Sequence, residues 1–222
     1  MLTPTPVTPT PFSGVAQVIR KGNTGRSEVA FSFDAGSDAG FTSQILDTLA
    51  ANDIKASFGM TGRWAEQNHD LLSRIVNEGH ELINHSYDHA SFTGQSTGKP
   101  PLTQAERWGE LDRTEAIVKQ ITGATTKPYF RPPYGDLDDS VNVDVGARGY
   151  AYNVMWTVDS RGWLGIPAVD ITQRCLEMAE PGGIYVFHVG SASQDGPALQ
   201  AIIDGVRAGG YQIGSVSDVL AP

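Results

Sequence analysis

From Ser27 onward, the chain alternates short apolar runs with longer segments of helical spacing. The apolar runs predict strands at residues 29–33, 56–60, 80–84, around 130, 151–158, 183–189 and 211–213. The spacing predicts helices at residues 41–52, 68–78, 103–122, 170–179 and 197–208, the third ending at Gly123 as its C-cap. Such alternation implies parallel strands covered by helices, and about seven strand–helix units in one domain favour an α/β barrel over an open sheet.

Length and charge restrict the class of protein further. The 222 residues suit one domain with a single core, and the formal net charge of −9 argues against a nucleic-acid partner. No run approaches the roughly 18 apolar residues of a membrane span. Cys175 is the only cysteine, which excludes an intrachain disulfide and a cysteine-based zinc cluster.

The first twelve residues, MLTPTPVTPTPF, have a composition unlike the rest. Alternating Thr and Pro favours an extended linker or tail, so we expect a tail at 1–12 and a catalytic domain at 13–222. No charged and apolar leader precedes this segment. We expect that an export signal was removed and that the protein is secreted, periplasmic or on the cell surface. The alternative is a cytosolic protein with an unusual tail.

Reactive side chains follow the predicted strands at the points where the strands end. In α/β barrels the carboxyl ends of the strands carry the chemistry. The residues in question are Asp34 after the first strand, His85 and His89 after the third, Arg131 after the fourth, Asp159 after the fifth and His188 in the sixth. Their recurrence at five strand ends predicts one catalytic site.

His85 and His89 are four residues apart, a spacing at which two imidazoles on one helical turn can bind the same divalent ion. The alternative for an isolated pair of this spacing is two solvated histidines. A preceding strand end and a third nearby histidine, His80, favour the metal site. We expect His80 itself to brace the start of the strand.

Each of the other strand-end residues has a catalytic and a structural interpretation. Asp34 is a candidate general base, or a turn former before Gly36. Arg131 could hold that carboxylate ionised, and the Pro-Pro pair after it could aim the Tyr134 N–H at an oxyanion; the alternative is a rigid turn. His188 is a candidate general acid, or a packed residue.

The motifs FDAG, NHSYDH, RPPYG, WTVDSRGW and IYVFH, in this order, resemble those of the NodB-homology polysaccharide deacetylases, carbohydrate esterase family 4. The resemblance covers about Ser27 to Val219. It implies a distorted (β/α) barrel that uses a divalent metal, zinc first and otherwise cobalt, nickel or manganese, to remove acetyl groups.

The resemblance also implies a role for each matching residue. Those roles are Asp34 as the base that activates water, His85 and His89 as metal ligands, Arg131 as the residue orienting the base, Tyr134 as oxyanion donor and part of the substrate site, Trp163 and Val186 as walls of the acetyl pocket, and His188 as the acid that protonates the leaving amine.

Two positions depart from the family pattern. Ala35 stands where the family has its third metal ligand, and Gly162 stands where the family has an aspartate that tunes the catalytic histidine. Asp38 could supply the missing ligand or cap the helix that begins near Gly40. Asp159 could replace the missing partner of His188.

These matches predict a metal-dependent N-deacetylase acting on N-acetylglucosamine-containing polysaccharide, either peptidoglycan or chitin-like oligomers. The alternatives are an O-acetyl esterase on xylan-type polymers, a metal-independent amide hydrolase, and a metal-depleted carbohydrate-binding relic. A monomer is the default expectation.

Overall fold

The computed structural model describes residues 14–36 and 38–222, so the predicted tail at 1–12 lies outside the described residues. Within the described part, nine strands form one sheet whose named pairs are all parallel. Its order is β1-β6-β5-β4-β3-β2-β8-β7, and β9 pairs with β2. The strands are β1 (Gln17–Ile19), β2 (Glu28–Ala35), β3 (Ser57–Met60), β4 (Glu81–Asn84), β5 (Tyr129–Phe130), β6 (Tyr152–Val154), β7 (Val158–Asp159), β8 (Ile184–His188) and β9 (Gln212–Gly214).

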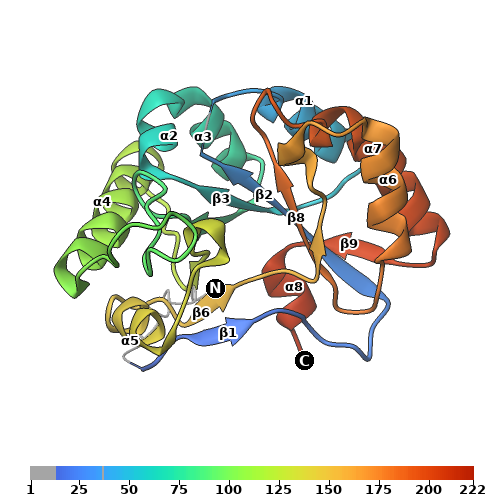
Figure 1. The fold of residues 1–222 in the computed structure, drawn as a ribbon. Helices are drawn as coiled ribbons and strands as arrows, with labels where there is room; N and C mark the ends of the chain where they lie inside the picture. Colours follow the sequence, from blue (N-terminus) through green and yellow to red (C-terminus); the bar gives the residue numbers. More distant parts are fainter. Residues whose placement is uncertain (1–13, 37) are drawn as a thin grey trace, which may run out of the picture.

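Helices cover the outside of this curved sheet (Figure 1), which confirms the predicted α/β barrel architecture. Helices α2, α3 and α4 lie together on one side, and α1, α6 and α7 lie on the other. The helices are α1 (Thr42–Ala51), α2 (Gly62–Gln67), α3 (His69–Asn77), α4 (Gln104–Thr122), α5 (Asp139–Ala147), α6 (Ala168–Glu177), α7 (Asp195–Ala208) and α8 (Val216–Leu220). None of the helices in the described residues is long and apolar enough to cross a membrane.

Strand β2 lies inside the sheet, between β3 and β8. Its side chains alternate between two environments. Phe31 and Phe33 belong to the main hydrophobic core, and their rings contact Phe187 of β8 at centroid distances of 5.1 and 5.2 Å. Ser32 and Asp34 alternate with them and contact the Arg131 side chain instead. The period of two thus puts apolar side chains against the helices and polar side chains toward the site.

The single strand predicted at 151–158 is two strands that belong to opposite ends of the sheet. β6 pairs with β1 and β5, whereas β7 pairs with β8. Between them, Met155 donates its N–H to the Ile19 carbonyl and Thr157 donates to the Ile184 carbonyl. Between residues 154 and 158 the chain therefore crosses from β6, near one end of the strand order, to β7 at the other end.

The other differences from prediction concern short elements that the sequence pattern indicates only weakly. β1 was missed because it is short and its side chains are largely exposed, and α5 and α8 were missed as well. The helix predicted at 68–78 is preceded by a separate helix, α2, which ends at Gln67 and has Asn68 as its C-cap. Gly123 caps α4 in the left-handed conformation, as predicted.

His80 braces the strand start as expected, and its pKa gives a testable pH dependence. The side chain is buried, and Nδ1 accepts the Ala56 N–H at 3.1 Å, which ties the start of β3 to the start of β4. Burial lowers the pKa of His80 from 6.5 to about 4. The unfolded chain takes up this proton at higher pH than the folded chain. Stability is therefore lost as the pH falls from 6.5 to about 4, by up to about 3 kcal/mol.

Urea unfolding at pH 7 and at pH 4.5 measures this loss. The variant His80→Asn keeps an acceptor near Ala56 but cannot titrate, so we expect a shallower loss of stability over the same interval. An unchanged dependence on pH in that variant would exclude His80 as the cause.

Candidate functional site

Asp34 and His188 lie side by side at the carboxyl ends of neighbouring parallel strands. They are directly paired in the register of β2 and β8. Asp34 is 8% exposed, and the His188 side chain is 31% exposed. A buried carboxylate and a partly accessible imidazole therefore face the same cleft.

The carboxylate of Asp34 is held by Arg131, which is completely buried. Arg131 Nη1 donates to Asp34 Oδ1 at 2.7 Å, Nη2 donates to Ser32 Oγ at 2.8 Å, and Nε donates to the Val154 carbonyl at 3.0 Å. Burial alone would raise the pKa of Asp34, but the charge and hydrogen bond of Arg131, together with the nearby His85 and His188, outweigh it and the pKa lies below 3.8. Asp34 is thus ionised and fixed in place.

Gly59 provides the space for this carboxylate, a requirement that the sequence analysis missed. Gly59 is paired with Asp34 in the register of β2 and β3. A Cβ atom at residue 59 would lie 2.6 Å from Asp34 Oδ1, closer than real Cβ contacts allow. A glycine inside an apolar strand was the signal for such a close approach.

The two predicted metal ligands lie together beside Asp34. His85 Nδ1 bonds to the Arg131 carbonyl at 2.8 Å, and His85 Nε2 is 3.7 Å from Asp34 Oδ2. The His85 and His89 rings are 4.8 Å apart. Burial lowers the pKa of His85, and it lowers the pKa of His89 to about 3. Both imidazoles are therefore neutral, the form that binds metal ions.

The residues fit the implied divalent metal only as a two-histidine site. Ala35 is buried in the main hydrophobic core and has no side-chain oxygen to offer a metal ion. Asp38 does not join the histidines, because its carboxylate accepts hydrogen bonds from Ser191 N at 2.8 Å and Ser191 Oγ at 2.6 Å. No group of three or more His, Cys, Asp or Glu side chains within the described chain is arranged to hold a metal ion.

Asp38 is not the helix cap either. Helix α1 begins at Thr42, and its N-cap is Phe41, without a side-chain capping bond. Asp38 instead ties the segment before α1 to the segment after β8 through Ser191. Both roles that the sequence suggested for Asp38 are thus replaced by a link between two loops.

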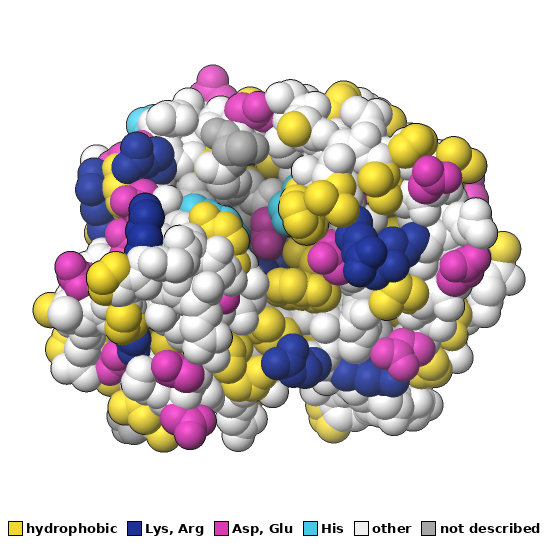
Figure 2. Space-filling model, in the orientation of Figure 1, with side chains coloured by type: hydrophobic (Ala, Val, Ile, Leu, Met, Phe, Trp, Pro, Cys, Tyr) yellow, Lys and Arg dark blue, Asp and Glu magenta, His cyan; other side chains and the backbone are white. Residues whose placement is uncertain are grey.

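The three predicted substrate-binding residues line one cleft of about 640 Å³. Val186 lies in β8 and is buried, whereas Trp163 and Tyr134 are 54% and 52% exposed. Tyr134 has a left-handed φ of 62°, and its ring packs edge-on against His89 at 4.6 Å. Figure 2 shows the hollow, with histidine and acidic side chains in its depth and hydrophobic side chains around its rim.

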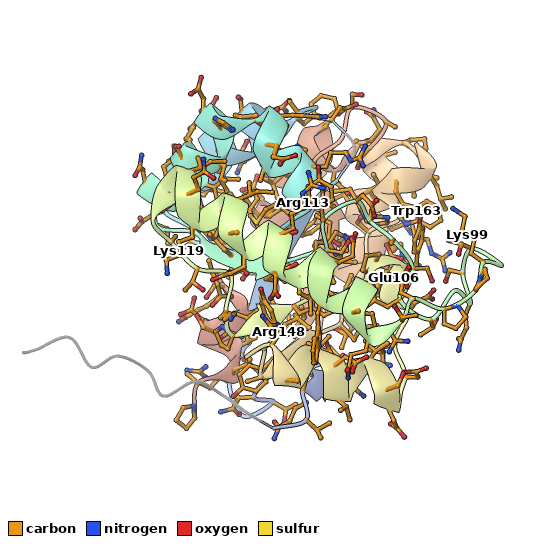
Figure 3. The ribbon with its side chains drawn as sticks, turned by 90° about the vertical axis from the view of Figure 1, so that its left-hand side faces the viewer. Lys99, Glu106, Arg113, Lys119, Arg148 and Trp163 are labelled. Atoms are coloured by element: carbon orange, nitrogen blue, oxygen red, sulfur yellow. The ribbon has the colours of Figure 1, made fainter. Side chains whose placement is uncertain are left out.

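The loop at residues 91–101 forms another part of the cleft wall. Ser96 lines the cleft, and Asp136 holds it by accepting hydrogen bonds from its N–H at 3.0 Å and from its hydroxyl. Asp136 also accepts from Ser91 Oγ at the start of the loop. Figure 3 shows Lys99 at the outer edge of this loop, on the side of the molecule that carries Trp163.

The carboxylate nearest to the His188 ring nitrogens in an ion pair is Asp195, not the predicted Asp159. Asp195 is the first residue of α7 and is completely buried. Its Oδ2 lies 3.8 Å from His188 Nδ1 and accepts the His188 N–H at 2.7 Å. Asp159 lines the cleft and accepts the Arg161 N–H. Asp195 was not predicted from the sequence, where its only signal was an acidic residue at the start of a helix.

Comparison with known proteins identifies the family. A sequence model described as polysaccharide deacetylase matches residues 21–153. A peptidoglycan-N-acetylglucosamine deacetylase of Bacillus cereus is 32% identical over 197 residues, covering 88% of this chain and 67% of the relative. The Bc1960 peptidoglycan N-acetylglucosamine deacetylase has a similar structure, with a TM-score of 0.82, 28% identity and coverage of 91% of this chain and 92% of the other.

The structure is also similar to that of BA3943 from Bacillus anthracis, described as a pseudoenzyme of the CE4 family. The TM-score is 0.84 at 26% identity, and the match covers 92% of this chain and 69% of BA3943. This fold is therefore found in deacetylases as well as in a pseudoenzyme. The matching family model, the fold and the strand-end motifs agree. The chain therefore belongs to the polysaccharide deacetylases, carbohydrate esterase family 4.

Proposed function

We propose that this protein hydrolyses N-acetyl groups of N-acetylglucosamine-containing polysaccharide, with peptidoglycan or chitin-like oligomers as substrates. The observation that carries the proposal is the register pair of Asp34 and His188. It sets an ionised base, clamped by Arg131, beside an imidazole at the floor of one cleft. Amide hydrolysis needs one group to take a proton from water and another to give a proton to the leaving nitrogen.

In the proposed reaction, Asp34 takes a proton from a water molecule as its oxygen attacks the acetamide carbonyl. The developing oxyanion is held by the Tyr134 N–H. When the carbon–nitrogen bond breaks, His188 gives its proton to the sugar nitrogen and acetate is released. Burial lowers the pKa of His188, but its interactions with Asp195, Asp34 and Asp159 together outweigh burial and raise that pKa above 6.5, which supports this role.

A divalent ion fits this proposal between the two neutral histidines, His85 and His89. Zinc is the first candidate, since imidazole suits zinc well, and the ion would polarise the carbonyl and acidify water. His85 Nδ1 donates its proton to the Arg131 carbonyl, which leaves Nε2 as the ligand atom of that residue. With two protein ligands in place of three, we expect weak metal binding.

The cleft walls support recognition of an acetylated sugar. Val186 supplies an apolar wall for the acetyl methyl group, while Trp163 and Tyr134 present exposed aromatic surface at the rim. We further propose that the protein acts outside the cytoplasm, because polymers of this class lie there. The open cleft suits a chain that is bound from outside.

The second candidate function is a carbohydrate-binding protein without catalysis. The incomplete metal site at Ala35 and the similarity to a pseudoenzyme favour it. Against it, the chain keeps a completely buried Arg131 paired with Asp34. Burial of such a pair costs solvation free energy, and a binding surface has no need of it.

Acetate release from N-acetylglucosamine oligomers separates the two functions. We expect chelator-treated protein to lose at least about tenfold in rate, and added zinc, cobalt, nickel or manganese to restore it, because the ion supplies part of the stabilisation of the transition state. Undiminished release after verified removal of metal would exclude the role of the ion. Binding of oligomers without any release, with or without metal, would favour the carbohydrate-binding protein.

A further inference from the structure

Gly162 and Asp195 compete for the same volume behind His188. Gly162 begins the 3-10 helix η2 (Gly162–Leu164), and Asp195 begins α7, 33 residues later in the chain. A Cβ atom at residue 162 would lie 2.4 Å from Asp195 Cγ and Oδ1, and 2.5 Å from Oδ2. The Asp195 carboxylate thus fills the space into which a side chain at 162 would extend.

This carboxylate is completely buried and is held by hydrogen bonds. Oδ2 accepts hydrogen bonds from the His188 N–H and from Ser160 Oγ, the latter at 3.0 Å. The start of α7 adds the favourable field of a helix N-terminus. In the described part of the chain, the only cationic side chain within 4 Å of Asp195 is His188. A buried carboxylate that has no Lys or Arg as an ion-pair partner is stabilised when a neighbouring histidine is protonated. Here that histidine is His188.

Each of the two side chains has one buried polar atom without a hydrogen bond. His188 Nδ1 and Asp195 Oδ1 are both buried and have no partner among the described groups. Buried polar atoms are rarely left unpaired. Nδ1 lies 3.8 Å from Oδ2, so a small rotation of either side chain makes the bond and leaves Nε2 as the nitrogen that exchanges protons in the cleft.

We propose that Asp195 is the positioning residue of His188, a carboxylate that acts from the start of α7 in place of the one missing at Gly162. It fixes the ring orientation and the tautomer and favours the imidazolium form. The proposal rests on the proposed function for the part of His188 in catalysis. The pairing itself does not depend on that function.

Other charged or titratable groups also face His188 and must be separated from Asp195 in any test. They come from three other elements and loops of the barrel. They are Asp34 at the end of β2, Asp159 in β7, and His85 and His89 after β4. Among the carboxylates, Asp159 is the matched control, because it lines the cleft and contributes to the charge around His188.

The first experiment compares Asp195→Asn with Asp159→Asn by NMR titration of the histidine rings in the full chain. The Asn side chain is nearly isosteric with Asp and keeps an oxygen for Ser160, but it carries no charge. We expect the pKa of His188 to fall by about 1 to 3 pH units in Asp195→Asn and by less in Asp159→Asn. A fall that is equal in both variants, or larger in Asp159→Asn, would overturn the proposal.

Activity gives a second readout. In Asp195→Asn we expect kcat to fall about 10- to 100-fold, with the optimum moved to lower pH and KM within about twofold, because Asp195 is buried and does not line the cleft. A wild-type kcat and pH profile in this variant would also overturn the proposal. If the wild type releases no acetate, the proposed function fails, and the NMR titration still decides whether Asp195 and His188 are paired.

The decisive test transfers the carboxylate from position 195 to position 162. Gly162→Asp alone brings its new Cβ against Asp195, so we expect Tm to fall by about 5 °C or more. Asp195→Ala removes the obstacle, so the double variant Gly162→Asp/Asp195→Ala should regain most of the lost Tm and raise the pKa of His188 above that in Asp195→Ala. Additive losses in Tm, with no recovery of that pKa, would show that the two positions are not equivalent.

Discussion

Replacing Asp34 by Asn should lower kcat for acetate release by about 100- to 10,000-fold, the usual loss when a general base is removed. The substitution keeps the shape of the side chain but removes the acceptor for the proton of water. We expect KM to change much less, because the cleft walls at Val186 and Trp163 remain in place. Steady-state kinetics on N-acetylglucosamine oligomers measure both constants.

Asp112→Asn is the matched control for this experiment. It is the same substitution on α4, where Asp112 makes an exposed ion pair with Arg148 at 2.6 Å. We expect its kcat to equal that of the wild type. Circular dichroism of both variants checks the fold, and wild-type turnover in Asp34→Asn would show that another group is the base.

Arg131→Met should cost about 3–5 kcal/mol of unfolding free energy, because it leaves the Asp34 carboxylate buried without its partner. The side-chain volume is nearly kept, so the loss reports the charge and its hydrogen bonds. Ser32 Oγ and the Val154 carbonyl also lose their donors. Urea unfolding at pH 7 measures the loss.

The double variant Arg131→Met/Asp34→Asn tests the cause of this loss. If the uncompensated carboxylate dominates, the double variant is more stable than Arg131→Met alone, and the two substitutions are strongly non-additive. A double variant less stable than Arg131→Met would assign the loss to packing and to the other hydrogen bonds. Arg131→Lys adds a second check, since a single ammonium cannot reach the three acceptors that the guanidinium binds.

The sequence was sufficient to predict the fold and most residues of the site, for a physical reason. The strands that carry Asp34 and His188 are rich in apolar residues, because nearly all of their side chains are buried, and parallel strands bring their carboxyl ends to one edge. Reactive residues directly after such runs must therefore converge. The cleft lined by Asp34, His85, His89 and His188 is this convergence.

The remaining features depend on contacts between segments far apart in the sequence. The run at 151–158 is mostly apolar, and nothing in it indicates that β6 and β7 pair with different strands. The sequence places Asp38 near the site, but only the fold shows that the Asp38 carboxylate accepts a hydrogen bond from Ser191. Asp195 follows a polar stretch, where an acidic residue at a helix start has an ordinary explanation.

The shared volume at Gly162 and Asp195 has a consequence for the descent of such proteins. Gaining a carboxylate at one position while the other still carries it crowds the two side chains, since a Cβ at 162 would lie 2.4 Å from Asp195. If the acidic residue moved between positions 162 and 195 by single substitutions, the intermediate protein had either two crowded carboxylates or no carboxylate beside His188. Homologues should therefore fall into two groups, with the acidic residue at one position and a small residue at the other. Searches that score position 162 alone will misclassify the second group as inactive.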